Sequence, residues 1–510
     1  MTGPLFTIVL CLAGADAAAP TAADIAATID RRIEEVATSG MVPVAPRSSD
    51  AEFFRRLTLD LRGHIPASQE VAQFLDDAGS DKRERAIRAA LDHVDHRKHF
   101  ATTWRRLLLP EAESQAQIQY FLPGFEAWLE EARTTDRGFD SIVRDLVAAP
   151  IHGTPDNPQM VLTDLSAPNP IAYIATKEAD PGKIAAGVTR LFLGVRLECA
   201  QCHDHPFDKW TRKQFWNQAA FFSGISRRGR GTFAPVVESR QMRSIGVMDT
   251  GETAEAVFLT GELPDVPEGL SPRAAYAEWM TSRENPFFAK AVVNRVWAQM
   301  MGTGLVDPVD DFQSVNPPSH PELLEELADA FADSGFQLDV LYAGICGSAS
   351  YQRTSWQTDE GQSDARLFAR MAVKPMTAEQ LYDSVQRVIG ESSASSNPRT
   401  RGDRRRFLDL FATPEASGEP ITSMPQALYL MNSATVERAV QVRATELAEK
   451  WSAEDAIREL YLRTLNRLPT DSERDLAVEL LNTNEGKDRS SRMADLYWAI
   501  LNLPEFRWNH

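Results

Sequence analysis

Apolar residues at helical spacing recur along most of this 510-residue chain, and this periodicity restricts the fold more than any other feature. The segment SSDAEFFRRLTLDLRG is typical. Ser49 and Glu52 match a capping box, and helical spacing places four apolar residues on one face: Phe53, Phe54, Leu57 and Leu61. Similar patterns occur in segments 80–94, 123–150, 180–202 and 271–301. A chain of this length is also too long to fold around a single hydrophobic core of ordinary size. The sequence therefore predicts a mainly α-helical protein with more than one domain.

The composition changes between residues 226 and 272, where helix-forming residues become scarce. Short strand-like runs such as PVVES and AEAVFLTG stand there between Gly, Pro and Asp residues. We therefore expect two helical domains, at 20–225 and 273–505, joined by a small β-rich linker or insert at 226–272.

The N-terminus has the pattern of an export signal. Leu5 to Ala13 form an apolar run, and the ADA sequence at 15–17 offers a cleavage site between small residues. A buried N-terminal helix is the alternative interpretation. We expect residues 1–17 to be a signal peptide and the mature protein to be periplasmic or secreted. No later apolar run is long enough to span a bilayer, so a transmembrane protein is not expected.

The formal net charge of −18 is spread along the chain rather than gathered in a tail. Such a surface repels nucleic-acid phosphates and anionic lipids, so we exclude nucleic acid as a partner. With 43% hydrophobic and 25% charged residues, the composition is that of a folded protein.

The stretch RLECAQCHDHPFDKW contains Cys199, Cys202 and His203 in the order C-x-x-C-H. A c-type haem needs two thiols about one turn apart and a following histidine that can face the iron. Haem attachment also needs export, which the N-terminus predicts independently. We therefore expect covalent haem c at Cys199 and Cys202, with His203 as the iron ligand.

The same residues allow other chemistry. Cys199, Cys202 and His203, together with His205 or Asp208, would provide a zinc or iron site. A redox dithiol or a structural clip is a further alternative. Cys346 lies in an apolar helical stretch and is expected to be a small buried residue.

An aromatic cluster follows the motif and would either cover a porphyrin or fill a helical core: Phe207, Trp210, Phe215, Trp216, Phe221 and Phe222. A sixth iron ligand cannot be chosen from the sequence, which offers Met242, Met248, His64, His152 and His320. The histidines at 93, 96 and 99 stand among charged residues and are expected on a solvated helical face.

The block NRVWAQMMGTGLVDPVDDF contains six residues of interest: Asn294, Arg295, Trp297, Asp307, Asp310 and Asp311. One interpretation is a polar pocket whose aspartates bind metal or act as acid and base. The other, which we favour, is an Asn/Arg network that holds helix ends around a Gly-Pro turn.

Two long segments, RRLTLDLRGHIPASQEVAQFL and RLFLGVRLECAQCHDHPFDKWTRKQFWNQAAFFSGI, resemble DUF1549, the cytochrome-like PSCyt2 domain of planctomycetes. NPFFAKAVVNRVWAQMMGTGLVDPVDDF, VKPMTAEQLYDSV and MPQALYLMNSATVE resemble its usual companion, DUF1553 or PSD1. The resemblance implies an exported, cytochrome-like protein whose label rests on Cys199, Cys202 and His203, and it implies no established reaction. Many companions carry cysteines before QAL, whereas this chain has none there.

These observations predict an exported cytochrome-like protein with one haem, which transfers electrons or couples a redox step to an unknown partner. The alternatives are a zinc- or iron-dependent enzyme acting on polysaccharide or cell-envelope material, and a structural binding protein of the envelope.

Overall fold

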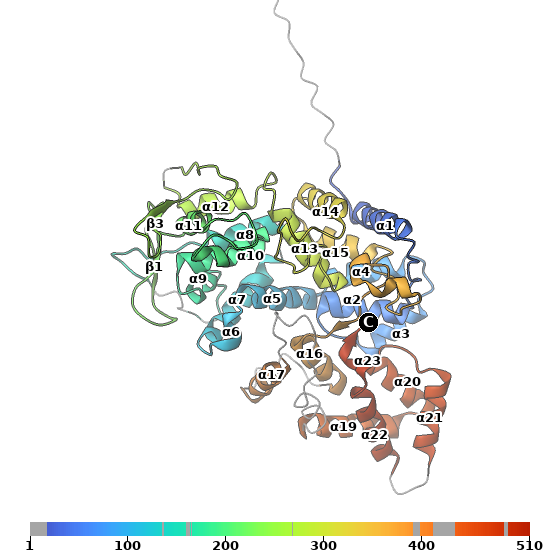
Figure 1. Cartoon of the computed structure of the whole chain (residues 1–510). Coiled ribbons are helices and arrows are strands. Elements are labelled where there is room, and N and C mark those ends of the chain that lie inside the picture. Colours follow the sequence, from blue (N-terminus) through green and yellow to red (C-terminus); the bar gives the residue numbers. More distant parts are fainter. Residues whose placement is uncertain are drawn as a thin grey trace, which may run out of the picture.

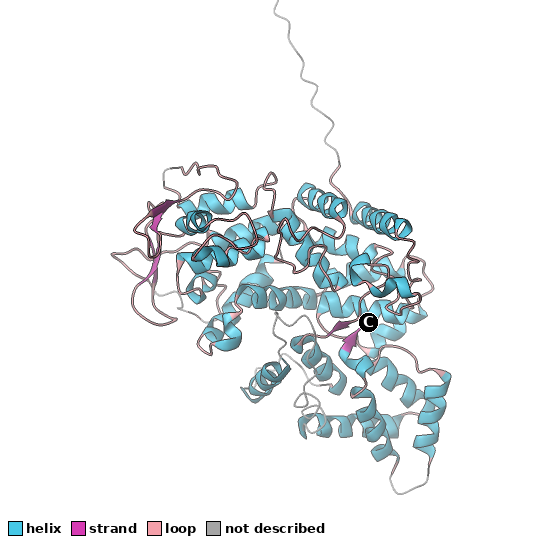
Figure 2. Cartoon of the chain, in the orientation of Figure 1, coloured by secondary structure: helices cyan, strands magenta, loops and turns pink. Residues whose placement is uncertain are grey.

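The computed structural model describes residues 18–134, 137–159, 164, 166–267, 269–390, 398–411, 434–483 and 488–510. Helices dominate these residues and the strands are short, which confirms the mainly α prediction (Figures 1 and 2). The predicted signal peptide at 1–17 lies outside the described residues. No helix in the described ranges has both the length and the apolar character needed to cross a bilayer.

The first half of the chain is almost entirely helical. Its helices are α1 (Ala22–Ser39), α2 (Asp50–Arg62), α3 (Ser68–Asp76), α4 (Lys82–Asp92), α5 (Val94–Leu108), α6 (Glu111–Ser114), η1 (Ile118–Phe121), α7 (Leu122–Ala132), α8 (Phe139–Val147), α9 (Ala172–Thr176), α10 (Pro181–Leu193), η2 (Glu198–Gln201) and α11 (Arg212–Ala220).

Helices return after the strand segment. They are α12 (Pro272–Met280), α13 (Phe288–Met301), α14 (Pro321–Asp333), α15 (Leu338–Gly347), η3 (Glu360–Ser363), η4 (Ala365–Leu367), α16 (Ala378–Ile389), α17 (Pro398–Phe411), α19 (Ala434–Lys450), α20 (Ala453–Thr464), α21 (Asp471–Asn482), α22 (Arg489–Leu501) and α23 (Pro504–Arg507).

The predicted joint contains two small antiparallel hairpins. Strand β1 (Ile225–Arg227) pairs with β2 (Val236–Glu238), and β3 (Ser244–Gly246) pairs with β4 (Thr253–Glu255). A third pair joins distant parts of the chain, because β5 (Lys374–Pro375) is antiparallel to β6 (Trp508–Asn509). The sequence did not indicate this last pair, since each strand has only two residues.

The start of α2 differs in one detail from the expected capping box. The Ser49 hydroxyl accepts a hydrogen bond from the Glu52 backbone N–H (3.2 Å), as expected. The Glu52 carboxylate does not return the bond, because it accepts instead from Arg56 Nη2 (2.6 Å) and from the Ser355 backbone N–H (2.7 Å). The residue expected to cap its own helix therefore links α2 to the second half of the chain.

The buried apolar side chains form two clusters. The larger runs from Ile25 to Met371 and unites the first half, the hairpins and helices α12 to α15. The smaller contains the helices after Met376, together with Leu59 and Ile65 from the first half. Helix α1 packs on α14 and α15 across the middle of the sequence. The change of packing unit thus falls near residue 374, well after the β-rich joint.

Helix α2 is buried on nearly all sides, although it carries several charges. Asp60, which is 4% exposed, accepts hydrogen bonds from Lys374 Nζ (2.6 Å), Asn509 Nδ2 (2.7 Å) and the Tyr351 hydroxyl (2.9 Å). One buried carboxylate therefore holds the β5–β6 pair against the first half. A buried charge is tolerated when it is paired and hydrogen-bonded in this way.

Two arginines of α2 satisfy backbone carbonyls of the second half. Arg55 donates to the carbonyls of Thr464 (3.2 Å) and Phe506 (2.9 Å). Arg56 donates to those of Tyr351 (2.6 Å) and Arg353 (3.0 Å). Because α2 sits between both apolar clusters, these bonds join the two packing units.

We expect Asp60→Ala to destabilise the protein by about 3–5 kcal/mol, because the buried Lys374 ammonium would lose its counter-charge. Asp475→Ala is the matched control, since the Asp475 carboxylate is 71% exposed and pairs with Arg474 at 2.9 Å; its cost should stay below about 1 kcal/mol. Denaturant unfolding of both variants measures the difference. Equal unfolding midpoints for the two variants would contradict the role of Asp60.

Candidate functional site

The C-x-x-C-H motif lies in the connection between α10 and α11, at the end of the molecule opposite the C-terminal helices α20 to α22 (Figure 1). Helix α10 ends at Gly194, whose φ of +67° is a left-handed conformation that suits glycine. A Cβ there would lie 2.5 Å from the Phe312 ring, so only glycine lets this ring pack closely. Val195 and Leu197 are then buried and position the motif.

Both motif cysteines face solvent as free thiols. Cys199 lies within the 3-10 helix η2, and Cys202 directly follows that helix with φ −103° and ψ −33°. Residues three apart on a 3-10 helix lie on the same side, one turn from each other. Ala200 between them points inward and is fully buried. Both thiols are therefore exposed, three residues apart at the end of η2.

The His203 ring is exposed and has a defined tautomer. Its Nδ1 lies 2.8 Å from the Asp204 carbonyl oxygen. A carbonyl can only accept, so Nδ1 carries the proton and Nε2 keeps its lone pair. This arrangement is usual for histidines that bind metals, in which the second nitrogen donates to a carbonyl or carboxylate. In the neutral ring, His203 thus keeps Nε2 as an acceptor.

His205 and Asp208 hold the loop together. His205 Nδ1 accepts from the Phe207 backbone N–H (3.3 Å), and Asp208 Oδ1 accepts from that of Lys209 (2.8 Å). No three His, Cys, Asp or Glu side chains among the described residues are grouped so as to hold a metal ion. The motif cysteines and histidines therefore do not form a preassembled zinc site with Asp208, and that alternative stays a prediction.

Helix α11 anchors the loop from behind. The Asp204 carboxylate accepts from the Arg212 backbone N–H (2.8 Å), next to a capping box between Thr211 and Gln214. The Gln201 carbonyl accepts from Arg212 Nε (3.3 Å) and from the Trp216 indole (3.1 Å). The residues on either side of Cys202 are therefore held by the same helix.

The aromatic residues after the motif divide into two groups. Phe207 is 75% exposed and lies in the motif loop. The other five are buried in the larger apolar cluster: Trp210, Phe215, Trp216, Phe221 and Phe222. These five therefore fill the core, and Phe207 alone of the cluster is available at the surface beside the cysteines.

The sixth-ligand candidates occupy very different places. His64 is hydrogen-bonded to Asp95 (2.9 Å), and His320 is buried beside Ser319. His152 and Met242 are exposed. Met248 is half exposed in the β3–β4 turn, and its carbonyl accepts from Arg212, which also contacts the motif through Gln201. Hydrogen bonds through Arg212 thus link Met248 to the motif.

Asn294 forms a hydrogen-bond network of the kind that we favoured for the segment NRVWAQMMGTGLVDPVDDF. Its fully buried carboxamide donates to the carbonyls of Val306 (2.8 Å) and Val309 (2.9 Å) and accepts from the Val306 backbone N–H (2.9 Å). These bonds hold the turn that contains the cis Asp307–Pro308 peptide. On the same turn Asp310 faces arginines of the first half.

His96 and His99 are not on a solvated face, so the expectation was wrong for these two, whereas the side chain of His93 is 39% exposed at the start of α5. His96 is buried and donates from Nδ1 to the Leu61 carbonyl (2.9 Å), because α5 packs on α2. His99 packs on Gly63, and its burial lowers its pKa to about 3. The charged residues between these histidines had predicted a solvent-exposed face. The helices that pack on α5 can be identified only from the tertiary structure.

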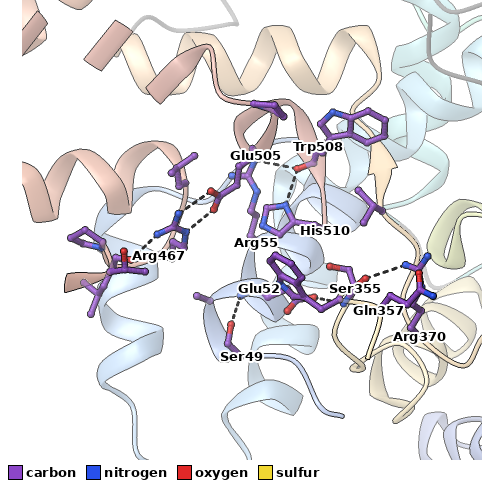
Figure 3. Close-up of a pocket in the computed structure, with 18 residues that line it drawn as sticks. Ser49, Glu52, Arg55, Ser355, Gln357, Arg370, Arg467, Glu505, Trp508 and His510 are labelled. Carbon is purple, nitrogen blue, oxygen red and sulfur yellow. Dashed lines mark hydrogen bonds and ion pairs between the residues drawn. The ribbon is translucent and has the colours of Figure 1, made fainter. Parts of the chain in front are cut away.

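His99 also lines a cavity of about 270 Å³ together with Asp60, Lys374 and Glu379. This cluster of charged groups was not identified from the sequence, since its members lie on α5, α2, β5 and α16. A second cavity of about 850 Å³ lies between α2 and the C-terminal helices (Figure 3).

The charged groups of the larger cavity already have partners. Arg467 binds Glu505 through contacts of 2.6 and 2.9 Å (Figure 3). It also binds Glu473, through contacts of 2.7 and 2.8 Å. Trp356, which also lines the cavity, is 76% exposed. The two cavities are lined by none of the residues of the C-x-x-C-H motif.

Comparison with family models identifies both halves of the chain. The model of PSCyt2, a protein of unknown function (DUF1549), matches residues 28–227. The model of PSD1, a protein of unknown function (DUF1553), matches residues 272–403 and 398–481. No curated protein and no solved structure matches the chain.

We expect Cys199 and Cys202 of the haem-free protein to react rapidly with a chromogenic disulfide reagent, because both thiols are exposed. Cys346 is fully buried, which raises its pKa, so it should react only after unfolding. The measurement uses a Cys11→Ser background. A further Cys199→Ser/Cys202→Ser change should remove the rapid phase, and slow reaction of all thiols would contradict the exposed placement.

His99 should make stability depend on pH. The folded state keeps it neutral down to about pH 3, whereas its ordinary pKa is 6.5, so the unfolded state binds the proton first. Stability should therefore fall as the pH decreases from 6.5 toward 3. His99→Gln should weaken this dependence, and His205→Gln should leave it unchanged. Unfolding midpoints between pH 4 and 7 measure it, and parallel profiles for all three proteins would contradict the assignment.

Proposed function

Because the chain belongs to the proteins that join a PSCyt2 domain to a PSD1 domain, we propose that it carries one covalent c-type haem and transfers electrons to a partner. Cys199 and Cys202 hold the haem, and His203 is the proximal iron ligand. One observation carries the proposal: two exposed free thiols stand one 3-10 turn apart, directly before a histidine whose Nε2 is open.

The chemistry of Cys199 and Cys202 fits the covalent attachment of a haem. Each cysteine holds a vinyl group by adding its S–H across the double bond, so that sulfur binds one carbon and the hydrogen goes to the other. This addition needs free thiols that solvent can reach, which both cysteines supply. It consumes no oxidant or reductant.

His203 would supply a nitrogen ligand to the iron, and the hydrogen bond from its Nδ1 to the Asp204 carbonyl fixes the ring and raises the basicity of Nε2. When bound, the haem supplies a one-electron redox couple whose potential depends on its axial ligands and its exposure. The position of the motif at the surface suits transfer to a docked partner, because an exposed group needs no path through the core.

The rival metal site has weaker support. His205 and Asp208 are engaged in hydrogen bonds of their own loop, and the described residues contain no preassembled group of metal ligands. Export to the periplasm or beyond, which haem attachment requires, remains part of the proposal.

Expression in a host with a haem-attachment system tests the proposal. The wild-type protein should keep its haem after denaturation and acid extraction, with a mass increase of one haem per chain. Cys199→Ser/Cys202→Ser should abolish this mass increase. His203→Ala should change the absorbance spectrum, because the axial nitrogen is lost. Cys346→Ala is the control and should keep the full haem content.

Three outcomes would overturn the proposal. A wild-type chain of unchanged mass from a competent host excludes haem attachment. Zinc or iron bound by that chain without a haem spectrum supports the metal-dependent enzyme instead. If Cys202→Ser alters only thermal stability, the motif is a structural clip.

A further inference from the structure

The segment that precedes the C-x-x-C-H motif contacts the turn of the second half that contains Asp310. Asp310 follows α13 and is 14% exposed. Three guanidinium groups surround its carboxylate, from Arg190 at 3.7 Å, Arg196 at 3.6 Å and Arg295 at 3.5 Å. Glu198, which directly precedes Cys199, lies 3.7 Å from Arg190. Residues from both family domains therefore share one charged cluster.

A backbone hydrogen bond holds these two segments together. The Phe312 backbone N–H donates to the Gly194 carbonyl (3.1 Å), and its ring packs on the space left by the missing Cβ of Gly194. From the other side, Asn294 holds the turn that carries Asp310. The charged cluster is therefore held in place by the Phe312–Gly194 backbone bond and by the hydrogen bonds of Asn294.

Arg190 and Arg196 have binding capacity left. Charge-assisted hydrogen bonds between arginine and carboxylate are usually about 2.7–2.9 Å long, and the contacts of these two arginines with Asp310 are longer. Within the described residues, the Nε of Arg190 has no hydrogen-bond partner. The side chains of Arg190 and Arg196 are 30% and 40% exposed, so a ligand can reach them.

Arginine side chains gather at this cluster, although the protein as a whole is acidic. Three guanidinium groups lie 3.5–3.7 Å from the carboxylate of Asp310. The chain as a whole carries −18. Arginine offers a planar fork of N–H donors that matches a carboxylate. A ligand carboxylate would complete the bonds that Asp310 leaves long.

We propose that Arg190 and Arg196 form a binding site for a ligand carboxylate beside the C-x-x-C-H motif. Such a carboxylate has two sources. One is a propionate of the haem, in which case the inference rests on the proposed function. The other is a separate organic acid that binds next to the redox group.

The haem-free protein tests the site itself, with succinate as the probe. Calorimetric titration should detect binding above that of chloride at equal ionic strength, because exposed charges are screened by salt. Arg190→Gln/Arg196→Gln should weaken succinate binding at least tenfold, and the milder Arg196→Gln should weaken it measurably. Arg230→Gln, an exposed cation outside the cluster, is the matched control and should bind as the wild type does.

Absence of succinate binding in the folded wild-type protein, or equal binding by the double variant, would overturn the inference. These results do not involve haem, so they are separate from a failure of haem attachment.

The haem-loaded protein distinguishes the two sources. If a propionate occupies the site, the loaded protein no longer binds succinate, and Arg196→Gln lowers the midpoint potential because a positive charge near the haem is lost. If the loaded protein binds succinate as tightly as the haem-free one, the site takes a separate acid. Either result supports a carboxylate site.

Discussion

The structure depends on the buried charges of helix α2. An isolated buried carboxylate or guanidinium group would cost several kcal/mol, so Asp60, Arg55 and Arg56 each require partners. Those partners are Lys374, Asn509 and backbone carbonyls between Tyr351 and Phe506, all from the second half of the chain. Helix α2 is therefore stable in this environment only when both halves are folded around it. Its satisfied charges specify one relative arrangement of the two packing units.

This arrangement leaves the motif at the far end of the molecule. The larger apolar cluster includes the residues on either side of the cysteines, among them Leu197 and Ala200, and the aromatic side chains of α11. The core thus holds the motif backbone while Cys199, Cys202 and His203 remain exposed. A rigid support under exposed reactive groups is typical of attachment and ligand sites, because geometry is kept without burying the chemistry.

The family models divide the chain at the β-rich segment, whereas the packing changes near residue 374. The second-half block around Asp310 packs on the first half directly before Cys199. The two domains are therefore not independent bodies joined by a linker. The segment that leads into the motif therefore lies beside residues of both domains.

Local patterns in the sequence determined the helical class, the position of the hairpins and the candidate motif. Helix periodicity and capping depend on residues three or four apart, and C-x-x-C-H is itself a local pattern. Glu52 was misassigned as a capping residue, and His96 and His99 as solvated residues, because their real partners are distant in sequence. Only the tertiary structure decided that Asp60 binds Lys374 and that Asp310 meets Arg196. These contacts join residues more than 100 positions apart, and long-range electrostatic pairing leaves no periodic trace in a single sequence.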